Sequence, residues 1–240
     1  GYGGRIAISF SSSNTYSGSI SVNGGSGYYT GGDGTAFIED TINSDITIPA
    51  NNSTWSASDR SSWKFRDLTI NGNVTFQPTS ATLLTISSSR TTTIASGVTI
   101  TLGGTYTTNS NGKGVRLDFT GNVTLPTTST ITANGKGYAG GSYRTSGSGP
   151  GAGGGVWQGG GGGYGGSGNT SGSGSGGGTY GSSTAPTDLG SGGGAGNNGG
   201  GAGGGAIRIT TTGTLTVSGT ITSIGASGGT SDCNYGGGGG

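Results

Sequence analysis

The sequence predicts an all-β fold: a parallel β-solenoid with short Thr-rich strands and an associated glycine-rich layer. Three observations carry this prediction. Apolar residues alternate with threonine over segments of three to five residues, which is the period of a strand. Asn-Gly, Ser-Gly, Gly-Gly or Pro separates these segments at close intervals, as turns do. A tract from 139 to 205 is about half glycine, and no part of the chain has the period of a helix.

Four strands are expected near the start of the chain. Residues 5–9 (RIAIS) alternate apolar and polar side chains, as a half-buried strand does. Residues 17–25 form a second candidate that ends in an Asn-Gly turn. Residues 35–40 and 45–48 follow, the latter directly before Pro49, which would end it.

The segment 51–67 differs from the rest because it gathers Trp55, Trp63, Phe65 and five charged residues. It is the most irregular part of the chain. We interpret it as an edge loop or side platform that covers a core. A carbohydrate-stacking surface and a contact between subunits are the alternatives.

Strand signals then follow in close succession. The segments begin at Leu68, Val74, Leu83, Thr91, Val98, Val115, Val123 and Thr130. Strands this short at such spacing fit the rungs of a parallel β-helix better than the longer strands of a sandwich. The pattern resumes after the glycine tract at 206–210, 214–217 and 220–222.

Internal repeats favour stacking. GGRIAIS from Gly3 matches GGAIRIT from Gly204, and SGSIS from Ser17 matches SGTIT from Ser218, both 201 positions apart. LTINGNVTF from Leu68 resembles a segment 49 positions later, which suits two coils of about 25 residues within an expected range of 20 to 25. Because such repeats gain stability from their neighbours, we expect end-to-end stacking into a fibre or tandem array.

These patterns divide the chain into rungs at 1–138, a glycine-rich layer at 139–205 and further rungs at 206–240. A free loop as long as the tract would be unusual in a compact domain. Extended strands resembling polyglycine II are expected instead, in which the backbone groups pair with adjacent strands. We therefore predict an ordered tract with little helix or regular strand and with its isolated Tyr and Trp side chains at its surfaces.

Those aromatic residues are the best functional candidates in the sequence. They would cover bare glycine backbone, stack between subunits or bind sugar, and packing is favoured because aromatic faces supply the burial that glycine lacks. With the two tryptophans at 51–67, the candidates for packing or glycan stacking are Trp55, Trp63, Tyr138, Tyr143, Trp157, Tyr164 and Tyr180.

Composition excludes several classes of function. The formal net charge is +1 and 8% of residues are charged, so no basic stripe is present for nucleic acid. No apolar run approaches the roughly 20 residues of a transmembrane helix. The absence of Met and of a signal peptide suggests an internal segment or a processed product. Cys233 is alone, which leaves a buried thiol or an intermolecular bridge.

The chain offers little for catalysis. It has no His, the usual general base and metal ligand, and we expect no enzyme activity, cofactor or metal site. Asp67 with its basic neighbours at 64 and 66, and Arg116 with Asp118, are the candidates that fold analogy would offer. Because residues 116 and 118 share a strand face, a surface ion pair is the favoured interpretation for them.

Outward-facing threonines support a further hypothesis. In VTITL the apolar residues Val98, Ile100 and Leu102 would point inward while Thr99 and Thr101 point outward. Ranks of this kind resemble the faces of ice-binding proteins. High β-propensity of threonine on a solvent face explains them equally.

Several segments together resemble a known class of protein. They are GGRIAI, SGSISVNGGSG, TITANGKGYAGGS, GGGTYGSSTAPTDLGSGGG and GGGAIRIT. This combination resembles the glycine-rich parallel β-helix repeats of very large secreted surface proteins of environmental bacteria, over nearly the whole chain except 51–67. The resemblance implies an extracellular, adhesin-like or fibre-forming protein at the cell surface. A polysaccharide-binding module is the second hypothesis and an ice-binding protein the third.

Overall fold

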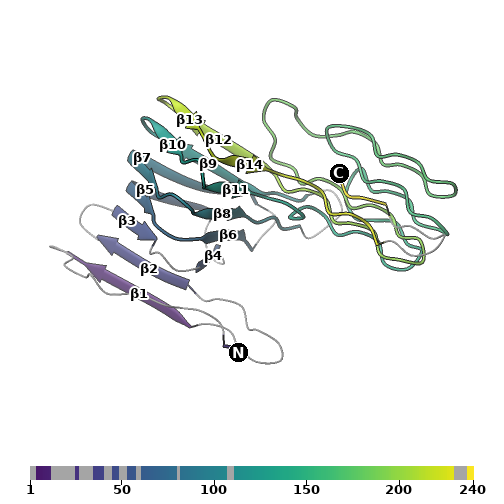
Figure 1. Cartoon of the computed structure of the whole chain (residues 1–240), viewed down its shortest axis with the longest axis horizontal. Helices are drawn as coiled ribbons and strands as arrows, with labels where there is room; N and C mark the ends of the chain where they lie inside the picture. Colours follow the sequence, from purple (N-terminus) through teal and green to yellow (C-terminus); the bar gives the residue numbers. More distant parts are fainter. Residues whose placement is uncertain are drawn as a thin grey trace.

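The computed structural model describes residues 4–11, 25–26, 35–40, 45–48, 53–57, 61–79, 82–106, 111–229 and 237–240. Every regular element in these ranges is a β-strand, so the all-β prediction is confirmed. The strands gather at one end of the molecule, and the glycine-rich tract forms its other end (Figure 1). Residues 17–24 of the strand predicted at 17–25 lie outside the described residues, as does Cys233.

Seven strands form the larger sheet, in the order β1-β2-β3-β5-β7-β9-β12. They are β1 (Arg5–Phe10), β2 (Thr35–Asp40), β3 (Asp45–Ile48), β5 (Ser62–Ile70), β7 (Leu84–Ile94), β9 (Val115–Phe119) and β12 (Ile207–Thr211). All neighbours in this sheet are parallel except β2 and β3, which pair antiparallel.

Five strands form a second, all-parallel sheet in the order β14-β11-β8-β6-β4. They are β4 (Ser53–Ala57), β6 (Val74–Pro78), β8 (Thr99–Leu102), β11 (Thr130–Thr132) and β14 (Thr220–Thr222). Strands β10 (Val123–Leu125) and β13 (Leu215–Val217) pair parallel by themselves. From β3 to β9 the chain alternates between the two larger sheets, so that each return adds one strand to each.

The register gives the spacing between stacked positions. Asp67 pairs with Thr91, 24 residues on, within the expected range of 20 to 25. Thr85 pairs with Arg116, 31 residues on, because a longer connection intervenes. Val115 pairs with Ile207, 92 residues on, because the glycine tract leaves the sheets after β11 and returns at β12.

The sequence echo at an offset of 49 does not mark stacked positions. Leu68 pairs with Thr92, whereas Leu117 pairs with Ile86. The two segments therefore share a local pattern of strand, Asn-containing turn and strand, but they occupy different faces of the stack.

The matching sequences at 3–9 and 204–210 contain β1 and β12, the two edges of the seven-stranded sheet. The strands run in opposite directions, because the antiparallel β2–β3 pair reverses the chain between them. The repeat in sequence is thus a repeat of strand chemistry at both edges of the sheet.

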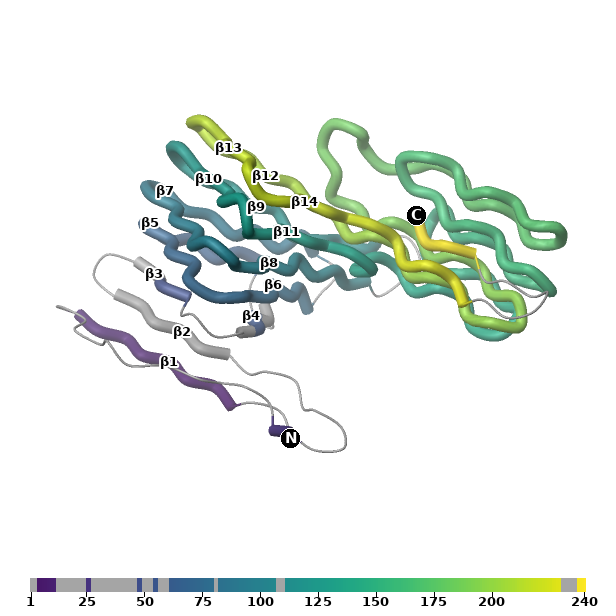
Figure 2. Tube along the Cα trace, viewed as in Figure 1, coloured from purple at the N-terminus to yellow at the C-terminus, as the bar shows by residue number. Residues whose placement is uncertain are grey.

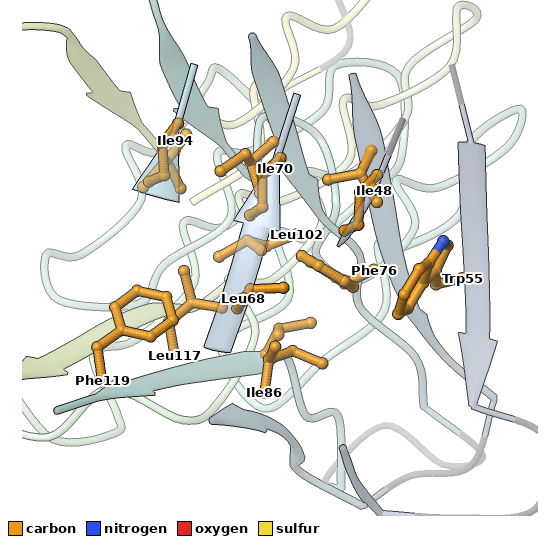
Figure 3. Packing of buried hydrophobic residues seen from close by; sticks show 14 of the residues in the cluster. Ile48, Trp55, Leu68, Ile70, Phe76, Ile86, Ile94, Leu102, Leu117 and Phe119 are labelled. Carbon is orange, nitrogen blue, oxygen red and sulfur yellow. The ribbon is translucent and has the colours of Figure 1, made fainter. Parts of the chain in front are cut away.

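Alternating side chains from the sheets fill one hydrophobic core (Figure 3). β6 and β9 each bury their first, third and fifth residues, as a strand with one apolar face does. Ile70, Leu102 and Phe76 come from different strands of this core and are among its labelled residues in the figure.

Residues 53–57 and 62–67, where we expected irregular chain, form β4 and the start of β5. Trp55, Trp63 and Phe65 belong to the core, while the neighbouring Lys64 and Arg66 stay outside it. The alternation of aromatic and basic residues was a strand signal, which the density of charge obscured.

Backbone hydrogen bonds between neighbouring runs order the glycine tract, which contains no helix and no named strand. Its runs travel away from the sheets and back (Figure 2). The run 190–195 lies among the others, and its amides donate in rotation to three of them. The pairs are Gly190 to Gly204, Ser191 to Gly163, Gly192 to Ser148, Gly193 to Gly201, Gly194 to Gly160 and Ala195 to Thr145.

The carbonyl groups of the same run follow the same rule on its other sides. The backbone N–H groups that donate to them are those of Tyr138 to Gly190, Gly240 to Ser191, Gly153 to Gly192, Gly141 to Gly193 and Gly237 to Gly194. Residues three apart in the run therefore form hydrogen bonds with the same neighbouring run. In all, six runs surround run 190–195. No side chain mediates these contacts, so the distance between backbones sets the packing.

That distance excludes side chains. A Cβ atom added to Gly194 would lie less than 3.0 Å from the carbonyl oxygen of Gly154, and one added to Gly192 would lie as close to that of Ala139. Since backbone atoms cannot move aside without breaking hydrogen bonds, glycine is required at these positions.

We predict that Gly194→Ala lowers the free energy of unfolding by about 1–3 kcal/mol, the usual cost of an overpacked site. Gly166→Ala is the matched control, because a Cβ atom there meets no atom within 4 Å and its change should stay within about 0.5 kcal/mol. Chemical denaturation and amide exchange at 190–195 would measure both. Equal effects of the two variants would contradict the packing described here.

Candidate functional site

The turns that join the glycine-rich runs lie at two ends of the bundle. Hydrogen bonds of run 189–196 to runs 137–142 and 145–149 place residues 143–144 and 156–158 at the end away from the sheets. Residues 196–198 turn at this same end (Figure 2). We call the side chains of Tyr143, Arg144 and Trp157 at this end the tip cluster.

Arg144 is fixed in an unusual backbone conformation. Its φ is 59°, and it is the one non-glycine residue with positive φ among those that the structure describes. Its N–H donates to the carbonyl of Gly196 at 2.7 Å, and its Nε donates to Asn197 Oδ1 at 2.8 Å. The turn at 196–198 therefore holds both the backbone and the side chain of this arginine.

The guanidinium of Arg144 lies over two aromatic rings. Its Cζ is 3.4 Å from the centroid of the Trp157 ring and 5.0 Å from that of Tyr143. Both rings remain exposed, Trp157 by 57%. The cation is attracted by the ring faces, so the three side chains form one surface unit.

The charge of the tip cluster has no counterpart within the tract. Arg144 is the one basic residue between 139 and 205, and Asp188 is the one acidic residue. Asp188 forms an ion pair with Lys113 and does not lie beside Arg144. Within the part of the chain that the structure describes, the tip cluster therefore presents a positive charge on an aromatic surface.

The other aromatic candidates lie elsewhere and are covered. Trp55 and Trp63 are buried in the core with ring centroids 5.2 Å apart in a T-shaped contact, and Trp55 also packs on Phe76. Neither can stack on a sugar in this fold. Tyr138 is buried against Tyr106, and its hydroxyl accepts a hydrogen bond from the N–H of Gly112.

Tyr164 and Tyr180 pack edge to face, with centroids 5.1 Å apart, between the sheets and the glycine bundle. The Tyr180 hydroxyl donates to the carbonyl of Leu189 and accepts from Ser191 Oγ at 2.8 Å. Ser191 Oγ in turn accepts from the N–H of Gly151 at 2.9 Å. This relay ties three segments of the chain together.

Two cavities of about 430 and 470 Å³ flank Tyr164, and Pro186 lines both. The buried Tyr164 hydroxyl has no hydrogen-bond partner among the residues that the structure describes. Burial raises the pKa of this tyrosine, as it does for Tyr138.

The charged residues considered for catalysis form ion pairs on the sheets. Arg116 Nε donates to Asp118 Oδ1 at 2.6 Å, which agrees with the ion pair expected for this strand face. Asp67 is held by Arg90, whose Nε donates to it at 3.0 Å. The hydrogen bond from Arg90 lowers the pKa of Asp67 and keeps this carboxylate ionised.

Within the described ranges, no group of three or more His, Cys, Asp or Glu side chains comes together as metal ligands would. The same part of the chain holds no helix that is long and apolar enough to span a bilayer.

Sequence reasoning named Tyr143 and Trp157 but not Arg144 or Asn197. A signal for them exists: one charged residue in an otherwise nearly uncharged tract, and an Asn pair that interrupts a glycine run as a turn would. What brings them together is the parallel course of two runs 52 residues apart in sequence, which no local pattern encodes.

Comparison of the chain with protein-family models, with curated proteins and with solved structures gives no match.

Tyr180 makes the junction sensitive to alkali. Burial raises its pKa to about 12, against about 10 for an unfolded tyrosine. The stability that this adds is full below pH 10 and is lost as pH rises toward 12, because the folded state holds the proton more tightly. We predict that Tyr180→Phe removes this part of the loss above pH 10, and lowers stability at pH 7 by about 1–2 kcal/mol through the lost hydrogen bonds.

Thermal unfolding between pH 7 and pH 12 would measure both effects. Tyr143→Phe is the control, because its exposed ring lies outside the relay. A pH profile of Tyr180→Phe identical to that of the parent protein would contradict the prediction.

Proposed function

We propose that this chain is a structural segment of an extracellular fibre or adhesin, in which units stack end to end. In this proposal the short strands are the rungs of a parallel solenoid. The glycine-rich bundle is a lateral arm of polyglycine II character, since a hydrogen-bond direction that repeats every three residues is that of a helix with three residues per turn.

The observation that carries the proposal is the uneven burial of the apolar columns in the core. Ile100, Ile131 and Ile221 are in register on three adjacent strands, and their exposed fractions are 1%, 3% and 38%. Leu125 is 1% exposed, whereas its partner Val217 is 46% exposed. Each column is covered until its last member, so the final strands present the inner face of a core to solvent.

A second copy of the chain is the occupant that fits this face. Among the described strands, β12 is one edge of the seven-stranded sheet and β1 is the opposite edge, so each can pair with a further strand on its outer side. The two edges have matching sequences, and Ile6 in β1 is exposed. Because β1 and β12 run in opposite directions, copies would join through an antiparallel pair like that of β2 and β3.

The other end of the core differs, and this gives the stacking a direction. There, β4 is the edge of its sheet, and its Trp55 is buried among Trp63, Phe65 and Phe76. One end is thus closed by aromatic side chains and the other is open. Contacts between unlike ends give open filaments when the rotation between successive copies does not close a ring.

We predict that the chain associates in a concentration-dependent way and that Val217→Lys weakens this association at least tenfold. A lysine there places a charge against the incoming apolar surface, while its stem still covers Leu125. Sedimentation velocity and electron microscopy of negatively stained samples would measure assembly.

Thr93→Lys is the control for this experiment, because it adds the same charge at an exposed position of β7 within the stack. Compact monomers at all concentrations of the parent chain would contradict the proposal, as would equal loss of assembly in both variants.

The threonine register of the smaller sheet supports ice binding as a second candidate function. Thr99, Thr130 and Thr220 are in register in one rank, and Thr75, Thr101, Thr132 and Thr222 in the next. The isoleucines between them point into the core, so the threonines share the outer face. Thr222 Oγ1 donates to Thr132 Oγ1 at 3.1 Å, which orders neighbouring hydroxyl groups.

If this face binds ice, the parent chain will show thermal hysteresis and Thr101→Lys will abolish most of it, because lysine interrupts the longer rank. Thr93→Lys, on the other sheet, should retain the activity. Absence of thermal hysteresis in the parent chain would dismiss this candidate.

A further inference from the structure

We propose that the tip cluster is a binding site for acidic glycans, in which the aromatic rings pack on sugar rings and Arg144 pairs with sugar carboxylates. This inference concerns the far end of the glycine bundle and does not depend on the stacking of units.

Arginine at position 144 adopts a backbone conformation that favours glycine. A left-handed backbone costs a side-chain-bearing residue about 1–2 kcal/mol, and glycine avoids that cost. Half of the surrounding tract is glycine, yet this turn has arginine at φ 59°. Non-glycine residues in this region mark functional sites when the structure around them holds them in place, as Gly196 and Asn197 do here.

The guanidinium of Arg144 has hydrogen-bond donors that a ligand can use. Among the described residues, Nε is the one nitrogen of this group that donates a hydrogen bond, and its acceptor is Asn197. The terminal nitrogens keep donors in the fork geometry that matches a carboxylate. No acidic residue of the tract competes for them, because Asp188 is paired with Lys113.

Trp157 supplies an exposed aromatic surface beside Arg144. Arg144 covers part of Trp157, yet 57% of this residue is exposed, and its chain neighbours on the far side of the turn are mostly glycine. Aromatic side chains with one wet and one apolar side suit ligands that combine apolar C–H faces with polar groups, as sugars do. A ring stacked beside a cation favours those sugars that also bear a negative charge.

Hydrogen bonds hold the two turns that carry the tip cluster in place. The turn at 156–158 is tied to its neighbour by the N–H of Gln158, which donates to Ser173 Oγ at 3.2 Å. The turn at 142–145 is closed by Thr145, whose N–H donates to the carbonyl of Ser142 at 3.0 Å. A surface that is already ordered loses little entropy when a ligand binds, which favours affinity.

The intrinsic fluorescence of the chain can report on this site. The protein has three tryptophans, and Trp55 and Trp63 are buried in the core. Emission accessible to a soluble quencher therefore comes from Trp157. Titration with oligomers of a hexuronic acid should shift this emission and protect it from iodide, whereas a neutral glucan of equal length should leave it unchanged.

We predict that Arg144→Gln weakens binding of the hexuronate oligomer at least tenfold, as measured by calorimetry. Trp157→Ala should weaken it to a similar extent. Arg90→Gln is the control, because it removes the same charge from an exposed arginine on β7, and its affinity should stay within twofold of the parent protein.

Arg144→Gly guards against a trivial result. It removes the side chain and relieves the backbone, so the bundle should stay folded while the affinity is lost. Equal binding of the neutral glucan, binding of sulfated but not carboxylated oligomers, unchanged affinity in Arg144→Gly, or no binding at all would each overturn the proposal. Val217→Lys should bind as the parent protein does, which separates this test from that of assembly.

Discussion

Pairing of backbone amide groups is the interaction on which both halves of this protein depend. In the sheets, the ladders are accompanied by apolar side chains that leave water together, so burial and hydrogen bonding reinforce each other. In the glycine bundle there is little side-chain surface to bury, and each run relies on several neighbours for its N–H and C=O partners. Because ordering glycine costs more backbone entropy than ordering other residues, such a bundle is stable only as a cooperative whole.

The junction between these two halves is where side chains matter most to the bundle. Leu189, Ser191 and Tyr138 enter the glycine-rich region with buried side chains near the sheets, whereas Ala195, buried farther out, has only a methyl group. Farther out the runs are almost bare until the turns at the tip. The molecule thus places its side-chain chemistry at the two ends of the bundle and leaves the middle to the backbone.

Much of the fold could be predicted from alternation alone. Strands such as β8, β9 and β11 have apolar residues at every second position, and that signal does not depend on context. The strands β4 and β5 were harder to predict, because the charged residues around Trp63 and Phe65 suggested a loop. The coil length could not be read from the echo between Leu68 and Leu117, because turns repeat locally without being stacked.

The candidate site was predictable in part for a similar reason. Tyr143 and Trp157 are conspicuous in a glycine-rich sequence, so their exposure followed from the lack of neighbours able to cover them. Their relation to Arg144 depends on which runs lie side by side, and backbone hydrogen bonds decide that without any trace in residue identity.

The excursion between β11 and β12 has a consequence for the order in which the chain folds. The pair of β9 and β12 cannot form before Ile207 is available to pair with Val115. The carbonyl groups of run 190–195 likewise lack some of their donors until residues 237–240 are in place. The rungs up to β11 can therefore form before the glycine-rich runs have all their partners, and residues 237–240 supply the remaining donors of run 190–195. Folding of this kind is dominated by contacts distant in sequence, which makes it slow compared with the zipping of neighbouring strands. The sheets formed by the strands up to β11 would then serve as the template on which β12, β13 and β14 pair.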